Sequence, residues 1–220
     1  MVSFDDYSDE VSEERVKHLK HFSPFYRVLA FFAALCLILL SLQGYFYLIH
    51  PSPKMNVVLA DVQSFISKDL RDPFSSHRPD EISAVLSENE NAIKQIANFI
   101  AARSCPSGDL VCQTKALFYF VRDQITYVPD AQFHDQLENP LAVLKTGGAD
   151  CEDMAVLVGA LQKAIGNEAR LVFIPGHAYA QVKIPGYWNK WYNLETTCKT
   201  CKFNDVPTEN LIQPKEFLPL

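Results

Sequence analysis

The chain has 220 residues, of which 48% are hydrophobic, so it is long and apolar enough to form one domain with a substantial core. A formal net charge of -6 and the lack of a basic stretch argue against nucleic acid as a partner. The sequence shows no internal repeat and no low-complexity tract.

The first predicted element is an uncharged apolar helix over Val28–Ile49. At about 1.5 Å per residue, a helix of this length crosses a hydrocarbon core of roughly 30 Å. A buried core helix would normally carry a polar stripe, and the h-region of a signal peptide is typically shorter, about 7–15 residues. We therefore expect a single-pass membrane anchor, with a tail over residues 1–27, a linker over 50–56 and a domain over 57–220.

Positive charges are unequally distributed around this apolar segment. Several precede it closely, whereas Lys54 alone follows it at similar range. Those that precede it are Arg15, Lys17, Lys20 and Arg27. Under the positive-inside rule, residues 1–27 are expected in the cytoplasm and the domain outside it.

Helical spacing of apolar residues continues after the linker. It predicts helices over Val57–Leu70, Glu81–Arg103 and Val111–Ile125. A loop follows, with a short helical turn over Pro140–Leu144 that begins favourably with proline. The next predicted helix, Cys151–Ile165, is apolar almost all round, so it is expected to be buried on most sides.

After this helix the apolar residues recur with a period of two. This pattern predicts strands over Arg170–Ile174, His177–Ile184 and Lys190–Glu195. Helices followed by a small antiparallel sheet indicate an α+β fold.

Three residues of this region carry the expected chemistry. Cys151 opens the buried helix behind Asp150, a candidate N-cap, and a helix N-terminus favours the reactive thiolate. His177 opens one strand and Glu195 closes the next. Together they supply the nucleophile, base and orienting acid of acyl transfer.

Negative charge around the cysteine supports a different interpretation. Asp150, Glu152 and Asp153 oppose formation of a thiolate at Cys151. The same domain could therefore be a catalytically inactive module that binds a peptide or serves as a scaffold.

The residues around this constellation resemble the core of the transglutaminase-like superfamily, which shares the papain-like cysteine fold. The resemblance lies in GGADCEDMAVLVGALQKAIGNEARLV, GHAYAQVKI and WYNLETT and covers about residues 110–200. The matching positions are Cys151, Ala169–Val172, His177–Tyr179, Trp191, Leu194 and Thr197. It implies a papain-like/transglutaminase-like fold for the domain.

The resemblance also implies roles for individual residues. Cys151 would attack a peptide or carboxamide carbonyl to form a thioester, His177 would transfer the proton, and hydrolysis or transamidation would follow. The family usually has aspartate where this chain has Glu195, so Asn193, on the same strand face, remains an alternative partner for the histidine.

The expected substrate is a protein or peptide. Tyr179 and Trp191 are candidate substrate-binding residues, with packing within the sheet as the competing interpretation. The chain shows no calcium loop of the kind that some transglutaminases carry, so neither a metal nor another cofactor is expected.

Four further cysteines are expected to be structural. In an extracytoplasmic domain they can form two disulfides, which leaves Cys151 unpaired. These four are Cys105, Cys112, Cys198 and Cys201. Zinc binding by the same four is the alternative, although the first pair is more widely spaced than is usual in zinc sites.

Overall fold

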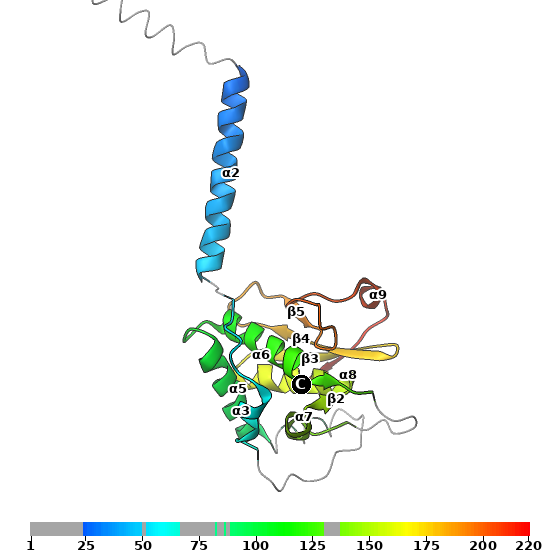
Figure 1. Ribbon diagram of the computed structural model, residues 1–220. Coiled ribbons are helices and arrows are strands. Elements are labelled where there is room, and N and C mark those ends of the chain that lie inside the picture. The colour runs from blue at the N-terminus through cyan, green and yellow to red at the C-terminus, as the bar shows by residue number, and fades with distance from the viewer. Residues whose placement is uncertain (1–23, 50–51, 67–81, 83–85, 87–88, 130–136) are drawn as a thin grey trace, which may run out of the picture. The chain divides into compact units, whose positions relative to one another are not determined.

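The computed structural model describes residues 24–49, 52–66, 82, 86, 89–129 and 137–220. The chain divides into two compact units, residues 1–49 and residues 50–220. The second unit is α+β, as predicted: helices come first, and a four-stranded antiparallel sheet follows (Figure 1).

The first unit contains helix α2, Pro24–Ile49, which begins slightly before the predicted start. Proline is favourable at the first position of a helix, where no intrahelical N–H bond is lost. No residue of the apolar window Pro24–Leu42 is buried, and this helix is long and apolar enough to cross a membrane. Its exposure is inconsistent with a buried core helix and leaves an anchor or a signal segment.

The helices predicted over Val111–Ile125, Pro140–Leu144 and Cys151–Ile165 are confirmed to within two residues at each end, whereas the described part of the helix predicted over Val57–Leu70 is shorter than predicted. The predicted helices over Val57–Leu70 and Glu81–Arg103 lie partly outside the described residues. The observed helices are α3, Leu59–Gln63; α5, Glu90–Ser104; α6, Leu110–Gln124; α7, Pro140–Thr146; and α8, Cys151–Ala164.

The main sheet has the order β5-β4-β3-β6 and is antiparallel throughout. Its strands are β3, Glu168–Ile174; β4, His177–Lys183; β5, Trp191–Leu194; and β6, Glu216–Pro219. Strand β6 follows the short helix α9, Thr208–Leu211, and neither was predicted from the sequence. Three of the four residues of β6 are exposed, so the strand lacks a clear apolar alternation.

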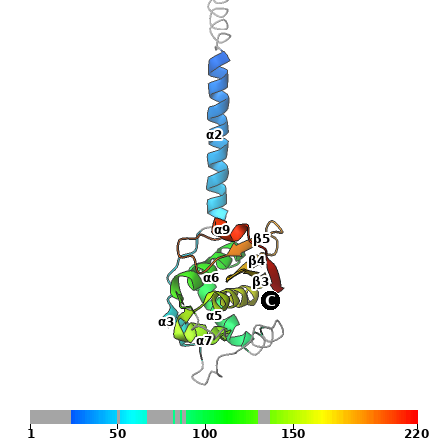
Figure 2. The same ribbon diagram turned by 90° about the vertical axis from the view of Figure 1, so that its right-hand side faces the viewer.

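Helix α8 occupies the centre of the domain. It contacts strands β3 and β4 as well as helices α5, α6 and α7 (labelled in Figure 1; Figure 2 shows the same elements turned by 90° with α8 unlabelled). Alternate residues of β4 share a face, and Ala178, Ala180 and Val182 are all buried. The predicted apolar helix is therefore confirmed as a buried element. Packing of its buried residues fixes the position of its first residue, Cys151.

Replacing Gly147 by alanine is expected to lower the free energy of unfolding by about 2 kcal/mol. Gly147 ends α7 with a left-handed φ of 78°, which costs a residue with a Cβ about 1 kcal/mol. A Cβ there would also lie 2.8 Å from Leu59 Cδ2. Gly166, with a φ of 93° and open space around it, provides the matched control. Urea unfolding should show a smaller loss for Gly166→Ala, and equal losses would contradict a steric contribution from Leu59.

Candidate active site

Two local structures position Cys151 at the start of α8. Strand β2, Gly148–Ala149, pairs in parallel with β1, Thr126–Tyr127, immediately before the helix. The Asp150 side chain then accepts a hydrogen bond of 3.1 Å from the backbone N–H of Asp153, as an N-cap does. The Cys151 thiol is free and partly exposed, so it lies at the protein surface on a rigid support.

His177 and Glu195 come from neighbouring strands. His177 is the first residue of β4, and Glu195 directly follows β5, which pairs with β4. His177 Nε2 lies 2.8 Å from Glu195 Oε2. The Glu195 side chain is 1% exposed, so the pair is shielded from water on the carboxylate side.

Asn193, the alternative partner for the histidine, contacts other groups. Its Oδ1 accepts a hydrogen bond of 2.8 Å from Gln181 Nε2, and its Nδ2 donates to the Asn204 carbonyl. The structure thus brings Glu195 to the imidazole and directs Asn193 elsewhere.

The surroundings of His177 favour its charged form. Burial, the largest single influence, lowers the pKa of His177, but hydrogen bonds to Cys151 and Glu195 and the charges of both raise it to about 10. Nε2 faces Glu195, so Nδ1 is the ring nitrogen available to exchange a proton with the Cys151 thiol. A charged imidazole beside a thiol is the arrangement that stabilises a thiolate nucleophile.

The acids beside Cys151 have structural partners. Asp150 caps α8, and Asp153, which is 2% exposed, accepts a hydrogen bond of 2.7 Å from the backbone N–H of Glu138. Asp153 therefore anchors the segment that leads into α7. Within the described residues, no group of three or more His, Cys, Asp or Glu side chains is arranged to hold a metal ion.

The two aromatic residues predicted near the substrate have packing roles in the sheet. Tyr179 is 1% exposed and stacks on His177, with ring centroids 6.3 Å apart. Burial and then the charge of Glu195 raise the pKa of Tyr179. The guanidinium carbon of Arg170 lies 4.1 Å from the ring centroid of Trp191 and 4.0 Å from that of Phe217. Contact of Tyr179 or Trp191 with substrate stays a prediction.

The four remaining cysteines of the domain form two disulfides, which confirms the predicted structural role over zinc binding. Cys105 pairs with Cys112, and Cys198 pairs with Cys201. Disulfides persist in oxidising compartments, so their presence, together with an apolar N-terminal helix, indicates a secreted or extracytoplasmic domain.

Thr197 was recognised in the sequence only as part of a motif, and the structure places it against the site. Its hydroxyl donates a hydrogen bond of 2.7 Å to Glu195 Oε1, and its backbone N–H donates to the same oxygen at 3.3 Å. A threonine two residues after an acid is the local signal for such a contact, because short hydroxyl side chains often bond to nearby groups.

Several solved structures are similar to this chain at low sequence identity. Similar solved structures include a candidate protease from Parabacteroides distasonis (14% identity, TM-score 0.38, covering 59% of this chain and 31% of that one). They also include a candidate cysteine protease from Cytophaga hutchinsonii (16%, 0.39, 59% and 44%). LapG from Legionella pneumophila is a third (15%, 0.38, 74% and 82%).

The chain spans less than half the length of the first two of these proteins. No curated protein matches it. Residues 81–196 match the family model described as the transglutaminase-like superfamily. Because that match covers more than half of the 220 residues, the chain belongs to the transglutaminase-like superfamily.

Proposed function

We propose that the protein is a membrane-anchored extracytoplasmic cysteine enzyme that acts on peptide or carboxamide bonds of protein or peptide substrates. One observation carries the proposal: His177 Nε2 lies 2.8 Å from the buried Glu195 carboxylate, and both Glu195 and Cys151 raise the pKa of that imidazole. Membership of the transglutaminase-like superfamily supports the same class of chemistry.

The geometry supports an acyl transfer in two steps. The Cys151 thiolate attacks the carbonyl carbon, and the C–N bond breaks as imidazolium His177 gives its proton to the leaving amine. Neutral His177 then takes a proton from water or from a second amine, which attacks the thioester and regenerates the thiolate. Glu195 keeps the ring oriented and stabilises its positive charge throughout.

The start of α8 offers a donor for the oxyanion that forms in each step. The first N–H groups of a helix have no intrahelical partner, so the Cys151 N–H is the candidate. The positive end of the helix dipole adds to this effect.

Anchoring and orientation complete the proposal. Helix α2 has the length and composition of a membrane span, and positive residues are concentrated before it. We place residues 1–27 in the cytoplasm and the domain over 57–220 outside it, where the two disulfides would persist.

Alkylation of Cys151 by iodoacetamide is expected to be nearly as fast at pH 6 as at pH 8. His177 has a pKa of about 10, so it stays charged over this range and supports the thiolate. In His177→Ala, Cys151 should behave as an ordinary thiol and slow about 80-fold between pH 8 and pH 6. The full chain in detergent micelles is used, and peptide mass spectrometry separates Cys151 from Cys36.

The opposite result has a definite meaning. If wild-type Cys151 already slows like an ordinary thiol and His177→Ala has no further effect, the pair is not activated. The domain is then a catalytically inactive binding or scaffold module. Circular dichroism on both proteins establishes that the comparison is between folded chains.

A further inference from the structure

The Glu195 carboxylate is held on both of its oxygens. Oε2 faces His177, and Oε1 accepts hydrogen bonds from the hydroxyl and the backbone N–H of Thr197. Glu195 is 1% exposed, so water cannot readily replace a lost donor. By holding Oε1, Thr197 therefore orients the carboxylate so that Oε2 faces His177.

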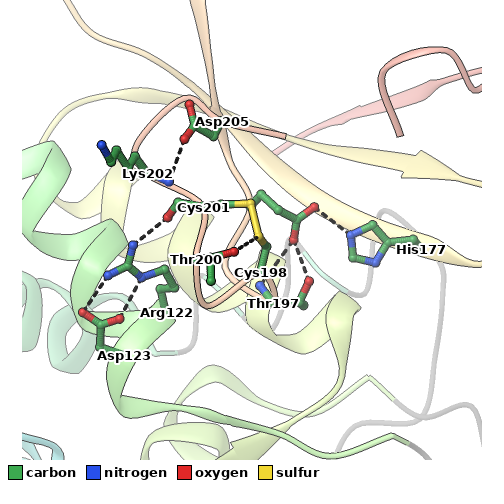
Figure 3. The surroundings of a disulfide bond; sticks show 10 residues. Arg122, Asp123, His177, Thr197, Cys198, Thr200, Cys201, Lys202 and Asp205 are labelled. Atoms are coloured by element: carbon green, nitrogen blue, oxygen red, sulfur yellow. Dashed lines mark hydrogen bonds and ion pairs between the residues drawn. A yellow bond between two sulfur atoms is a disulfide. The ribbon is translucent and has the colours of Figure 1, made fainter. Parts of the chain in front are cut away.

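A disulfide begins at the next residue along the chain. Cys198 is bonded to Cys201, and the Cys201 N–H also donates to the Cys198 carbonyl at 3.1 Å. The backbone that carries Thr197 thus enters a covalently closed turn (Figure 3).

This closed turn is tied to the C-terminal end of α6. Lys199 Nζ donates to the carbonyls of Ile125, at 2.7 Å, and Arg122. In return, Arg122 Nη1 donates to the Cys201 carbonyl at 2.6 Å. Because α6 packs on α8, the closed turn is attached to the same packed helices that carry Cys151.

We propose that Thr197 is a positioning residue for the candidate triad, acting through Glu195, and that the Cys198–Cys201 disulfide keeps Thr197 in place. The inference rests on the proposed function, because it concerns the same histidine and cysteine. Dependence on the Cys198–Cys201 disulfide also makes the site sensitive to redox conditions. A dithiol that reduces this disulfide supplies two electrons and two protons, becomes a disulfide itself and leaves two free thiols at Cys198 and Cys201.

Thr197→Val tests the hydroxyl at nearly constant shape. Loss of this hydrogen bond lets the Glu195 carboxylate turn away from His177, so the imidazolium and the thiolate it supports become less stable. Cys151 alkylation at pH 6 should slow about tenfold, and the midpoint of the pH profile should move to higher pH. Thr197→Ser retains a hydroxyl and should restore the wild-type profile.

The second disulfide of the domain provides a matched control for the first. Cys198→Ser with Cys201→Ser should shift the Cys151 alkylation profile in the same direction as Thr197→Val. Cys105→Ser with Cys112→Ser removes the disulfide between the end of α5 and the first turn of α6, and the hydrogen bonds of Glu195 are with His177 and Thr197, so it should leave the midpoint unchanged. Thermal unfolding of both double variants shows how much general stability each one loses.

The outcomes separate this inference from the proposed function. An activated wild-type Cys151 whose profile is unchanged by Thr197→Val contradicts the positioning role and leaves the proposed function intact. Equal shifts in the two disulfide variants contradict the specific link between Cys198–Cys201 and the site. An ordinary profile in the wild-type protein overturns the proposed function itself.

Discussion

Replacement of Cys151 by alanine is expected to slow the release of nitrophenolate from p-nitrophenyl acetate at least about a thousandfold, because the acylated residue is lost. The wild-type thiolate attacks the ester carbonyl and releases nitrophenolate, which leaves an acetyl thioester on Cys151. Stopped-flow absorbance should show a burst of about one nitrophenolate per chain, and alanine cannot form the thioester.

The chain contains its own control for this experiment. Cys36 is the other free cysteine among the described residues, and it lies in the apolar helix α2, whose own sequence contains no histidine. Cys36→Ala should retain the full burst. Peptide mass spectrometry locates the acetyl group, and a burst retained in Cys151→Ala would place the nucleophile at another residue.

The sequence predicted the elements whose apolar period is long and clear. Helix α8 is apolar almost all round, as suits a helix that contacts the sheet and three helices, and this pattern can be recognised without knowing its neighbours. Strands β3 and β4 likewise alternate between a buried and a less buried face, so their bounds were close. Local sequence patterns were therefore sufficient to predict α8, β3 and β4.

Elements that depend on distant partners were not predicted. Strand β6 is mostly exposed and exists because it pairs with β3 near the end of the chain. Strands β1 and β2 have two residues each, and their pairing joins segments that are far apart in sequence. Such short ladders carry no periodic signal.

The choice between Glu195 and Asn193 also required the register of the sheet. Asn193 lies opposite Gln181, further along β4 than His177, and the two amides bond to each other. Glu195 follows the last pair, Ala180 with Leu194, so it lies closer to His177. The longer side chain of glutamate is then compatible with the reach to Nε2, where the family usually has aspartate.

Replacing Glu195 by glutamine is expected to lower the pKa of His177 from about 10 toward its ordinary value of 6.5. Glutamine has almost the same shape but no charge, so burial, which lowers the pKa of His177, is then opposed mainly by Cys151 alone. A titration of the His177 ring by NMR measures the change directly. Asn193→Ala removes a neighbour that does not contact His177 and should leave the titration unchanged.

The same substitution should change how stability depends on pH. The pKa of His177 is raised on folding, so its contribution is complete below pH 6.5 and is lost as pH rises through about 10. A rise from 6.5 to about 10 corresponds to about 5 kcal/mol, and partial exposure of His177 to screening solvent reduces this. The wild-type free energy of unfolding should therefore fall by on the order of 3 kcal/mol over this interval because of His177. Lysine and tyrosine titrations occur in both proteins, so the difference between the Glu195→Gln and wild-type urea curves isolates this contribution. Parallel curves would show that Glu195 does not hold His177 in its charged form, and the acid would then lose its proposed place in the triad.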